Sequence, residues 1–216
     1  MIILGLDPSL VIGAGLVALN AEDRRVLLFE TWSSSNLHEG YIATAAIAKK
    51  VSIAISRISV SMRVRLAVEK PFFKQWVGKF DSVGAAVKIA RKGSVTIRGK
   101  GGLTSEYLNR CIGIFAAHFP VVIDYPPGDW RSQAEIDQSK GQDRKLNGMM
   151  RAVEFIESTN KNNPVADLLI AAIMQGNDHL GEAACIAYVD AKISNFVNRN
   201  SKFVGGKRDR KTKNPS

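Results

Sequence analysis

The sequence lacks the long hydrophobic runs that carry a chain across a membrane. No stretch reaches the roughly eighteen consecutive apolar residues that a bilayer-spanning helix needs. Met1 leads directly into the apolar segment Ile2–Leu6 with no basic region before it, which is the pattern of neither a secretory signal nor a transit peptide. We therefore expect a protein that makes no contact with a membrane and acts in the cytoplasm, or in the host cytoplasm if the chain is viral.

Cysteine is also scarce. The only two, Cys111 and Cys185, each stand among apolar neighbours. Such a chain has no disulfide framework of the kind that stabilises small secreted domains, and we expect two buried free thiols in a reducing compartment. With 216 residues and no internal repeat, the chain has the length of one domain with its own core.

Acidic residues are few relative to basic ones. The 20 acids against 30 lysines and arginines leave a net charge of +10, which predicts a polyanionic partner because cationic surfaces release counterions from nucleic acids. Residues 199–216 hold seven basic residues and the single acid Asp209, a net +6. We predict a folded domain over residues 1–198 and a disordered basic tail over 199–216, for which we favour DNA binding over a merely solubilising role.

The order of the predicted elements indicates an α/β fold. Three strands are followed by a helix, a strand, a helix, a strand and then further helices, which is the order of an RNase H-like mixed sheet flanked by helices. In the first helix, Ile47, Val51, Ala54 and Ile58 share the face that we expect to be buried. The predicted strands are 2–6, 13–19, 26–32, 63–69 and 121–124, and the predicted helices are 40–59, 105–119, 144–157, 164–174 and about 178–196.

Two acids end apolar strands. Asp7 closes the first strand directly before a proline, and Glu69 closes a later strand two residues before another. Each has a plain structural alternative, since Asp7 could cap the next turn and Glu69 could pair with Lys70 or Arg65. If the two strand ends lie side by side, however, the carboxylates raise each other's pKa unless a divalent cation sits between them. The pair therefore favours a Mg²⁺ or Mn²⁺ site with oxygen ligands.

A second acidic pair lies near the C-terminus. Asp178 and Glu182 are four residues apart and so share one helical face, beside His179. The following Ala183 and Ala184 are small, which predicts that this face packs closely against the rest of the fold. The pair fits either a further group of metal ligands or an acidic first turn that complements the helix dipole.

Several segments resemble, in order, the motifs of RuvC-type Holliday-junction resolvases, a family of the RNase H superfold. Residues 2–9 with 13–17 look like the opening strand and hairpin, 67–73 like the second acidic strand with its aromatic loop, and 178–188 like the last acidic helix. Strand-end aspartates also open actin-like ATPases, but those need a second domain and further phosphate-binding loops. The resemblance covers roughly residues 1 to 190, and we expect no nucleotide cofactor.

Two further segments support the same resemblance. Asp129-Trp130-Arg131, after a double proline, resembles a motif of phage-type members of the family, and Lys145 falls near the position of their catalytic lysine. The resemblance implies a homodimer that cuts opposing strands of branched DNA and leaves 5′-phosphate ends. Lys145 would then neutralise phosphate charge in the transition state.

The resemblance also implies the ligand and DNA-contacting residues. Two Mg²⁺ ions about 4 Å apart, with Mn²⁺ as a substitute, would activate a water and stabilise the leaving oxygen. Phe72 and Phe73 would stack on bases unpaired at the branch point. The implied metal ligands are Asp7, Glu69, Asp178 and Glu182, and the implied DNA contacts are Phe72, Phe73, Lys74, Arg131 and Lys140.

One ligand assignment has an alternative. Residues 163–172 also resemble the last acidic helix of bacterial resolvases, which would make Asp167 the final ligand in place of Glu182. The positions before Asp167 hold Asn163 and Pro164, so one carboxylate would be missing, and we prefer the later helix. Two other functions remain open from the residues: another RNase H-like nuclease that acts on flaps or RNA–DNA hybrids, and a DNA-binding protein without catalysis.

Overall fold

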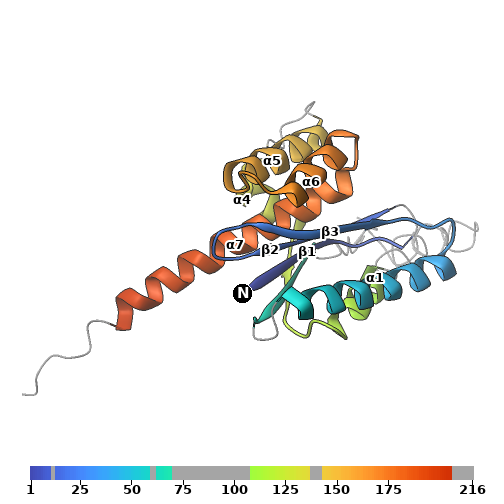
Figure 1. The fold of residues 1–216 in the computed structure, drawn as a ribbon, viewed down its shortest axis with the longest axis horizontal. Coiled ribbons are helices and arrows are strands. Elements are labelled where there is room, and N and C mark those ends of the chain that lie inside the picture. The colour runs from blue at the N-terminus through green and yellow to red at the C-terminus, as the bar shows by residue number, and fades with distance from the viewer. Residues whose placement is uncertain (11–12, 59–61, 70–107, 137–142, 206–216) are drawn as a thin grey trace, which may run out of the picture.

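The computed structural model describes residues 1–10, 13–58, 62–69, 108–136 and 143–205, with side chains up to Asn195. It contains a five-stranded mixed sheet in the order β3-β2-β1-β4-β5, with helices on both faces (Figure 1). The first three strands pair antiparallel, and β1, β4 and β5 run parallel. The strands are β1 Ile2–Asp7, β2 Ala14–Asn20, β3 Val26–Trp32, β4 Val64–Glu69 and β5 Val122–Tyr125, and the helices are α1 Leu37–Ile58, residues 108–116, α4 Pro127–Gln133, α5 Arg144–Thr159, α6 Pro164–Met174 and α7 Asp178–Gly205.

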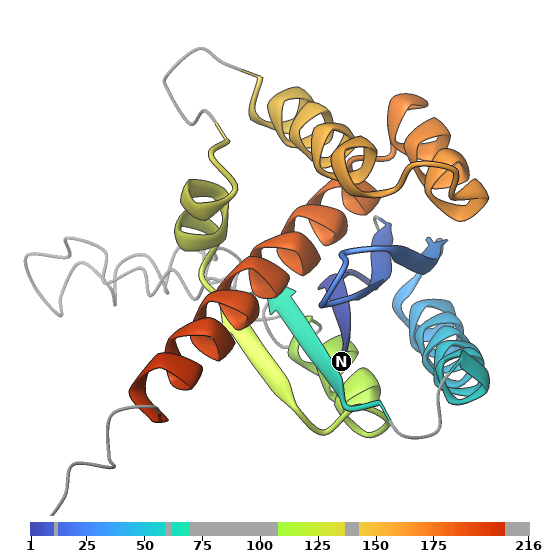
Figure 2. The ribbon, with the colours of Figure 1, turned by 60° about the vertical axis from the view of Figure 1, so that its left-hand side comes forward.

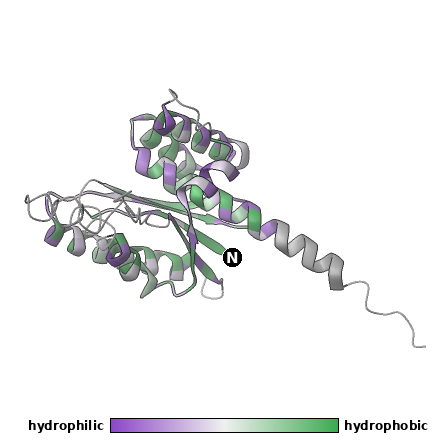
Figure 3. Cartoon of the chain, turned by 180° about the vertical axis from the view of Figure 1, so that it is seen from behind, coloured by the Kyte–Doolittle hydropathy of each residue, from purple (hydrophilic) through white to green (hydrophobic). Residues whose placement is uncertain are grey.

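Alternating side chains of the sheet build two separate cores. On β1, Ile2, Leu4 and Leu6 join the core beneath α1, whereas Ile3 joins the core beneath α7. This alternation follows from the two-residue period of a strand whose faces are both covered. Figure 3 shows the apolar strands between the two helical layers. Side chains at odd positions of β1 therefore face α7.

Helix α7 lies unusually close to the sheet, because glycines face it. A Cβ atom on Gly5 would lie 2.8 Å from the Cβ of Ala187 and closer still to the carbonyl oxygen of Ala183. A Cβ atom on Gly15 would meet the backbone of α7 at Leu180, at 2.8 Å from its nitrogen. Figure 2 shows α7 crossing the sheet along its length. The small residues on both sides thus bring the first turns of α7 to the ends of the central strands.

A buried ionic cluster fixes α7 farther along. Asp190 is fully buried and accepts hydrogen bonds from the Tyr125 hydroxyl at 2.6 Å and from Arg65 at 3.1 Å. Arg65 also donates to the Ser194 hydroxyl at 2.8 Å. A buried carboxylate needs such partners to offset its desolvation. These bonds tie α7 to β4 and β5 and so set the position of its N-terminal turns.

The structure confirms the predicted α/β architecture and strand order. Cys111 and Cys185 are buried free thiols, as expected. Three differences concern helices. The short helix α4 lies between the predicted strand 121–124 and the predicted helix 144–157, where the sequence predicts no helix. Helix α7 continues to Gly205, so residues 199–205 of the predicted tail are helical. Residues 206–216 lie outside the described residues.

The third difference concerns the buried face of α1. The buried stripe is Gly40, Thr44, Ala48, Val51 and Ile55. Val51 is buried as predicted, whereas Ile58 is exposed. A hydrogen bond accounts for the buried Thr44, because the indole nitrogen of Trp32 donates to its hydroxyl at 3.1 Å inside the core. None of the helices in the described part of the chain has the length and hydropathy to cross a bilayer.

Candidate metal centre

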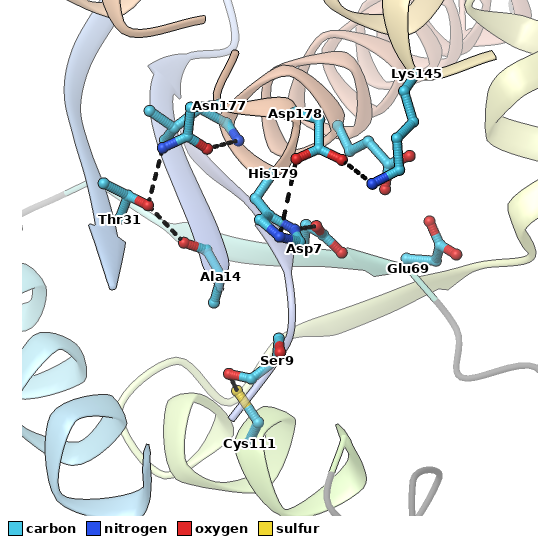
Figure 4. Close-up of polar contacts among 12 residues, drawn as sticks. Asp7, Ser9, Ala14, Thr31, Glu69, Cys111, Lys145, Asn177, Asp178 and His179 are labelled. Carbon is cyan, nitrogen blue, oxygen red and sulfur yellow. Dashed lines mark hydrogen bonds and ion pairs between the residues drawn. The ribbon is translucent and has the colours of Figure 1, made fainter. Parts of the chain in front are cut away.

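Three acids meet at the C-terminal edge of the two central parallel strands. In the β1–β4 register Leu6 lies beside Val68, so Asp7 and Glu69 follow at the same edge of the sheet. Glu182 reaches this edge from the second turn of α7. Each of the three residues offers a carboxylate oxygen, and these atoms all lie within 4.8 Å of one another. We call Asp7, Glu69 and Glu182 the acid cluster; Figure 4 shows how Asp7 and Glu69 lie.

The acids of the cluster are partly buried, and that burial is costly for their charge. Desolvation raises the pKa of Glu69 from 4.5 to about 7, and the neighbouring charges of Glu182 and Asp7 act in the same direction against that of Arg131. Desolvation likewise raises the pKa of Asp7 and of Glu182. A divalent cation would relieve this repulsion, and hard cations prefer carboxylate oxygens. The donor set therefore fits Mg²⁺ or Mn²⁺.

Helix α4 supplies two side chains to the cluster. The indole nitrogen of Trp130 donates to Oε2 of Glu69 at 3.0 Å. Nη2 of Arg131 lies 3.2 Å from Oε1 of Glu182 and 3.5 Å from Oε2 of Glu69. The guanidinium carbon of Arg131 lies 4.7 Å from the centroid of the Trp130 ring. The sequence predicts Arg131 as a DNA contact, whereas the structure places it between two of the acids.

Asp178 and Lys145 form a pair beside the cluster. The Lys145 amine donates to Asp178, and this bond raises the pKa of Lys145. Desolvation acts to raise the pKa of Asp178, but the bond with Lys145 and the charges of His179 and Lys145 together hold it below its usual value. Asp143 caps α5 by accepting from the backbone N–H groups of Lys145 and Leu146, which places Lys145 in the first turn of the helix.

His179 connects the helix to the strand. Its Nδ1 lies 2.6 Å from Oδ2 of Asp7, and its Nε2 lies 3.9 Å from Oδ1 of Asp178. The bond with Asp7 is the main cause that raises the pKa of His179, because it favours the protonated ring. The imidazole also packs on the backbone at Gly13, where a Cβ atom would lie 2.9 Å from the ring. His179 thus holds one oxygen of Asp7 in place (Figure 4).

The remaining predicted residues fall elsewhere. Asp167 is exposed on α6 and does not join the acid cluster. Phe72, Phe73, Lys74 and Lys140 lie outside the described residues. The bonds that Trp130, Arg131 and His179 make to the acids were not predicted from the sequence. The available signals were the Trp-Arg pair after the double proline and the spacing of His179 three residues before Glu182.

Comparison with known proteins shows a similarity of fold to a solved structure. No protein-family model matches the chain, and no curated protein matches it. Among solved structures, the fold is similar to that of "T. thermophilus RuvC in complex with Holliday junction substrate", with a TM-score of 0.54. The sequence identity is 15%, and the match covers 91% of this chain and 96% of that chain. The chain therefore has a RuvC-like, RNase H-like fold.

Proposed function

We propose that this protein is a divalent-metal-dependent endonuclease that cleaves four-way DNA junctions. The acid cluster carries the proposal, because two adjacent strand ends and one helix bring three carboxylates within 4.8 Å at the edge of the sheet. The net charge of +10 supports a nucleic-acid substrate. The similar fold of the T. thermophilus RuvC in its junction complex supports branched DNA in particular.

Asp7, Glu69 and Glu182 would hold the metal, with Asp178 beside them as a further ligand for a second ion. When bound, Mg²⁺ or Mn²⁺ would lower the pKa of the attacking water and neutralise charge on the scissile phosphate. Lys145 has a 70% exposed side chain beside Asp178, so its amine is open to a phosphate oxygen that approaches the site. In this proposal Lys145 is the residue that binds that oxygen.

Two neighbours orient the ligands. His179 fixes Oδ2 of Asp7, and Trp130 fixes Oε2 of Glu69. Hydrogen bonds of this kind hold a carboxylate in the orientation that a metal requires, and their loss typically weakens metal binding or activity about 10- to 100-fold. We assign both side chains as positioning residues, since they contact the acids rather than the reacting atoms.

The specificity for a branch point completes the proposal. Phe72 and Phe73, with Lys74 beside them, would stack on bases that a junction leaves unpaired, and a homodimer would place two such sites on opposing strands. The phage-type resemblance of residues 129–131 belongs to the same proposal. Replacing both phenylalanines by alanine should then reduce cleavage of junctions far more than binding to plain duplex.

The test is cleavage of four substrates of matched sequence with Mg²⁺: a four-way junction, a duplex, a flap and an RNA–DNA hybrid. We expect symmetric cuts in the junction with 5′-phosphate ends and little cleavage of the duplex. Preference for flaps or hybrids would establish another RNase H-like nuclease. Tight junction binding without any cleavage, in Mg²⁺ or Mn²⁺, would establish a DNA-binding protein without catalysis.

A further inference from the structure

A cation of the protein already sits where the metal site is proposed. The Arg131 guanidinium contacts Glu69 and Glu182, and its side chain is only 24% exposed. Both acids also belong to the group whose oxygens lie within 4.8 Å of one another. A single positive group of α4 therefore lies between two of the three carboxylates that would hold a divalent ion.

This arrangement puts the guanidinium against two of the carboxylates that would also hold a metal ion. The guanidinium of arginine carries a permanent positive charge in proteins. A divalent ion bound by Glu69 and Glu182 would repel the adjacent guanidinium and draw on the negative charge of the same two carboxylates. Lys145 contacts a different acid, because its ion pair is with Asp178 beside the cluster.

We propose that Arg131 is an internal counter-cation that competes with divalent metal for Glu69 and Glu182, so that metal binding requires the guanidinium to turn out of the acid cluster. This inference rests on the proposed metal site. The competition stabilises the acid cluster while metal is absent and lowers its affinity for free metal ions. The guanidinium also makes a cation–π contact with the Trp130 ring, which is available to the side chain beside the cluster.

The chain offers a matched control for this idea. Arg151 also lies over an aromatic ring, with its guanidinium carbon 4.5 Å from the centroid of Phe155. Its ion-pair partners are Glu135 and Glu154, which are not in the acid cluster. Arg131→Gln and Arg151→Gln therefore remove the same charge and a similar ring contact, but only the first removes a cation from the proposed metal site.

The experiment is titration calorimetry of Mn²⁺ into the full chain without DNA at about pH 8, above the raised pKa of Glu69 of about 7. We expect Arg131→Gln to bind Mn²⁺ roughly tenfold more tightly than the wild type, the size of one charge-assisted bond. Arg151→Gln should bind Mn²⁺ as the wild type does. In a thermal melt, Arg131→Gln should be less stable than the wild type in EDTA and gain more from added Mn²⁺.

Each outcome separates the two claims. Equal or weaker Mn²⁺ binding by Arg131→Gln, with normal binding by the wild type, would overturn the competition and leave the proposed function standing. No Mn²⁺ binding by the wild type or the variant, or binding that survives Glu69→Gln unchanged, would overturn the metal site and this inference with it. If Arg131→Gln does not fold, Arg131→Met keeps the aliphatic stem against Trp130 and serves in the same comparison.

Discussion

The Nδ1 atom of His179 lies 2.6 Å from Oδ2 of Asp7, which joins the first turn of α7 to the end of β1. The two residues are 172 positions apart in the chain, and the close contact of α7 with Gly5 brings them together. The bond leaves Asp7 with one oxygen held by the protein. His179 therefore determines how this acid faces the rest of the cluster.

Replacing His179 by alanine should lower the turnover of junction cleavage roughly 10- to 100-fold, because Asp7 loses its orienting partner. Junction affinity should change little, since it rests on lysine and arginine contacts to phosphate. Asparagine, whose amide can donate near the place of Nδ1, should retain more activity than alanine. His118→Ala is the control, because His118 is exposed and stands before the start of β5, whereas Asp7 and Glu69 stand at the ends of β1 and β4. Equal activity of His179→Ala and the wild type would remove the positioning role.

Glu182→Gln should damage cleavage far more than Asp167→Asn. Glu182 belongs to the acid cluster, whereas Asp167 is exposed on α6. Both substitutions remove one charge and keep the shape of the side chain, so circular dichroism should show that both variants are folded. The reverse ranking would assign the final ligand to α6 and contradict the placement of the site on α7.

Gly5→Ala should destabilise the protein, because the new methyl group would meet α7 at Ala183 and Ala187. Overpacking of this kind typically costs about 1–3 kcal/mol. Gly113→Ala is the matched control: nothing lies within 4 Å of a Cβ atom there, and alanine favours the helix by about 1 kcal/mol. Urea denaturation measures both. A neutral effect of Gly5→Ala would show that α7 does not need this close approach.

The stability of the metal-free protein should depend on pH through Glu69. Burial raises the pKa of Glu69 from 4.5 to about 7, so the folded state holds a proton that the unfolded chain releases in this window. The stabilisation from this bound proton is complete below about pH 4.5 and is lost as the pH rises through about 7. The shift corresponds to at most about 3 kcal/mol in the free energy of unfolding.

Glu69→Gln stays uncharged and should lack this dependence. Urea denaturation in EDTA between pH 4.5 and 8 should therefore show the wild type losing stability relative to the variant as the pH rises. Comparing the two proteins removes the contribution of His179. Its raised pKa also makes the folded state less stable as the pH rises. Parallel pH curves would mean that Glu69 is not strained by its burial.

The ends of the two acidic strands could be predicted from local sequence. Asp7 and Glu69 each close an apolar run shortly before a proline, and the central place of β1 and β4 follows from the usual order of such folds. The two-residue period of β1 then places Ile3 and Gly5, and hence Asp7, toward α7. These features depend on residues that are neighbours in the chain or on one strand.

The partners of the acids could not be predicted in the same way. Arg131 reaches the cluster only because the seven-residue helix α4 begins at Pro127 and turns its side chains toward Glu69 and Glu182. The buried face of α1 was mispredicted because a hydrogen bond from Trp32 draws the polar Thr44 into the core. Both features depend on contacts between distant segments, which hydrophobic periodicity does not describe.

Cleavage of a four-way junction by Asp7→Asn tests the central claim most directly. The amide keeps the shape of the side chain but lacks the charge that would hold Mg²⁺, whereas DNA affinity rests on basic residues. We expect the variant to bind the junction nearly as the wild type does and not to cut it at any ordinary Mg²⁺ concentration. Cleavage by Asp7→Asn at the wild-type rate would remove Asp7 from the site and contradict the account.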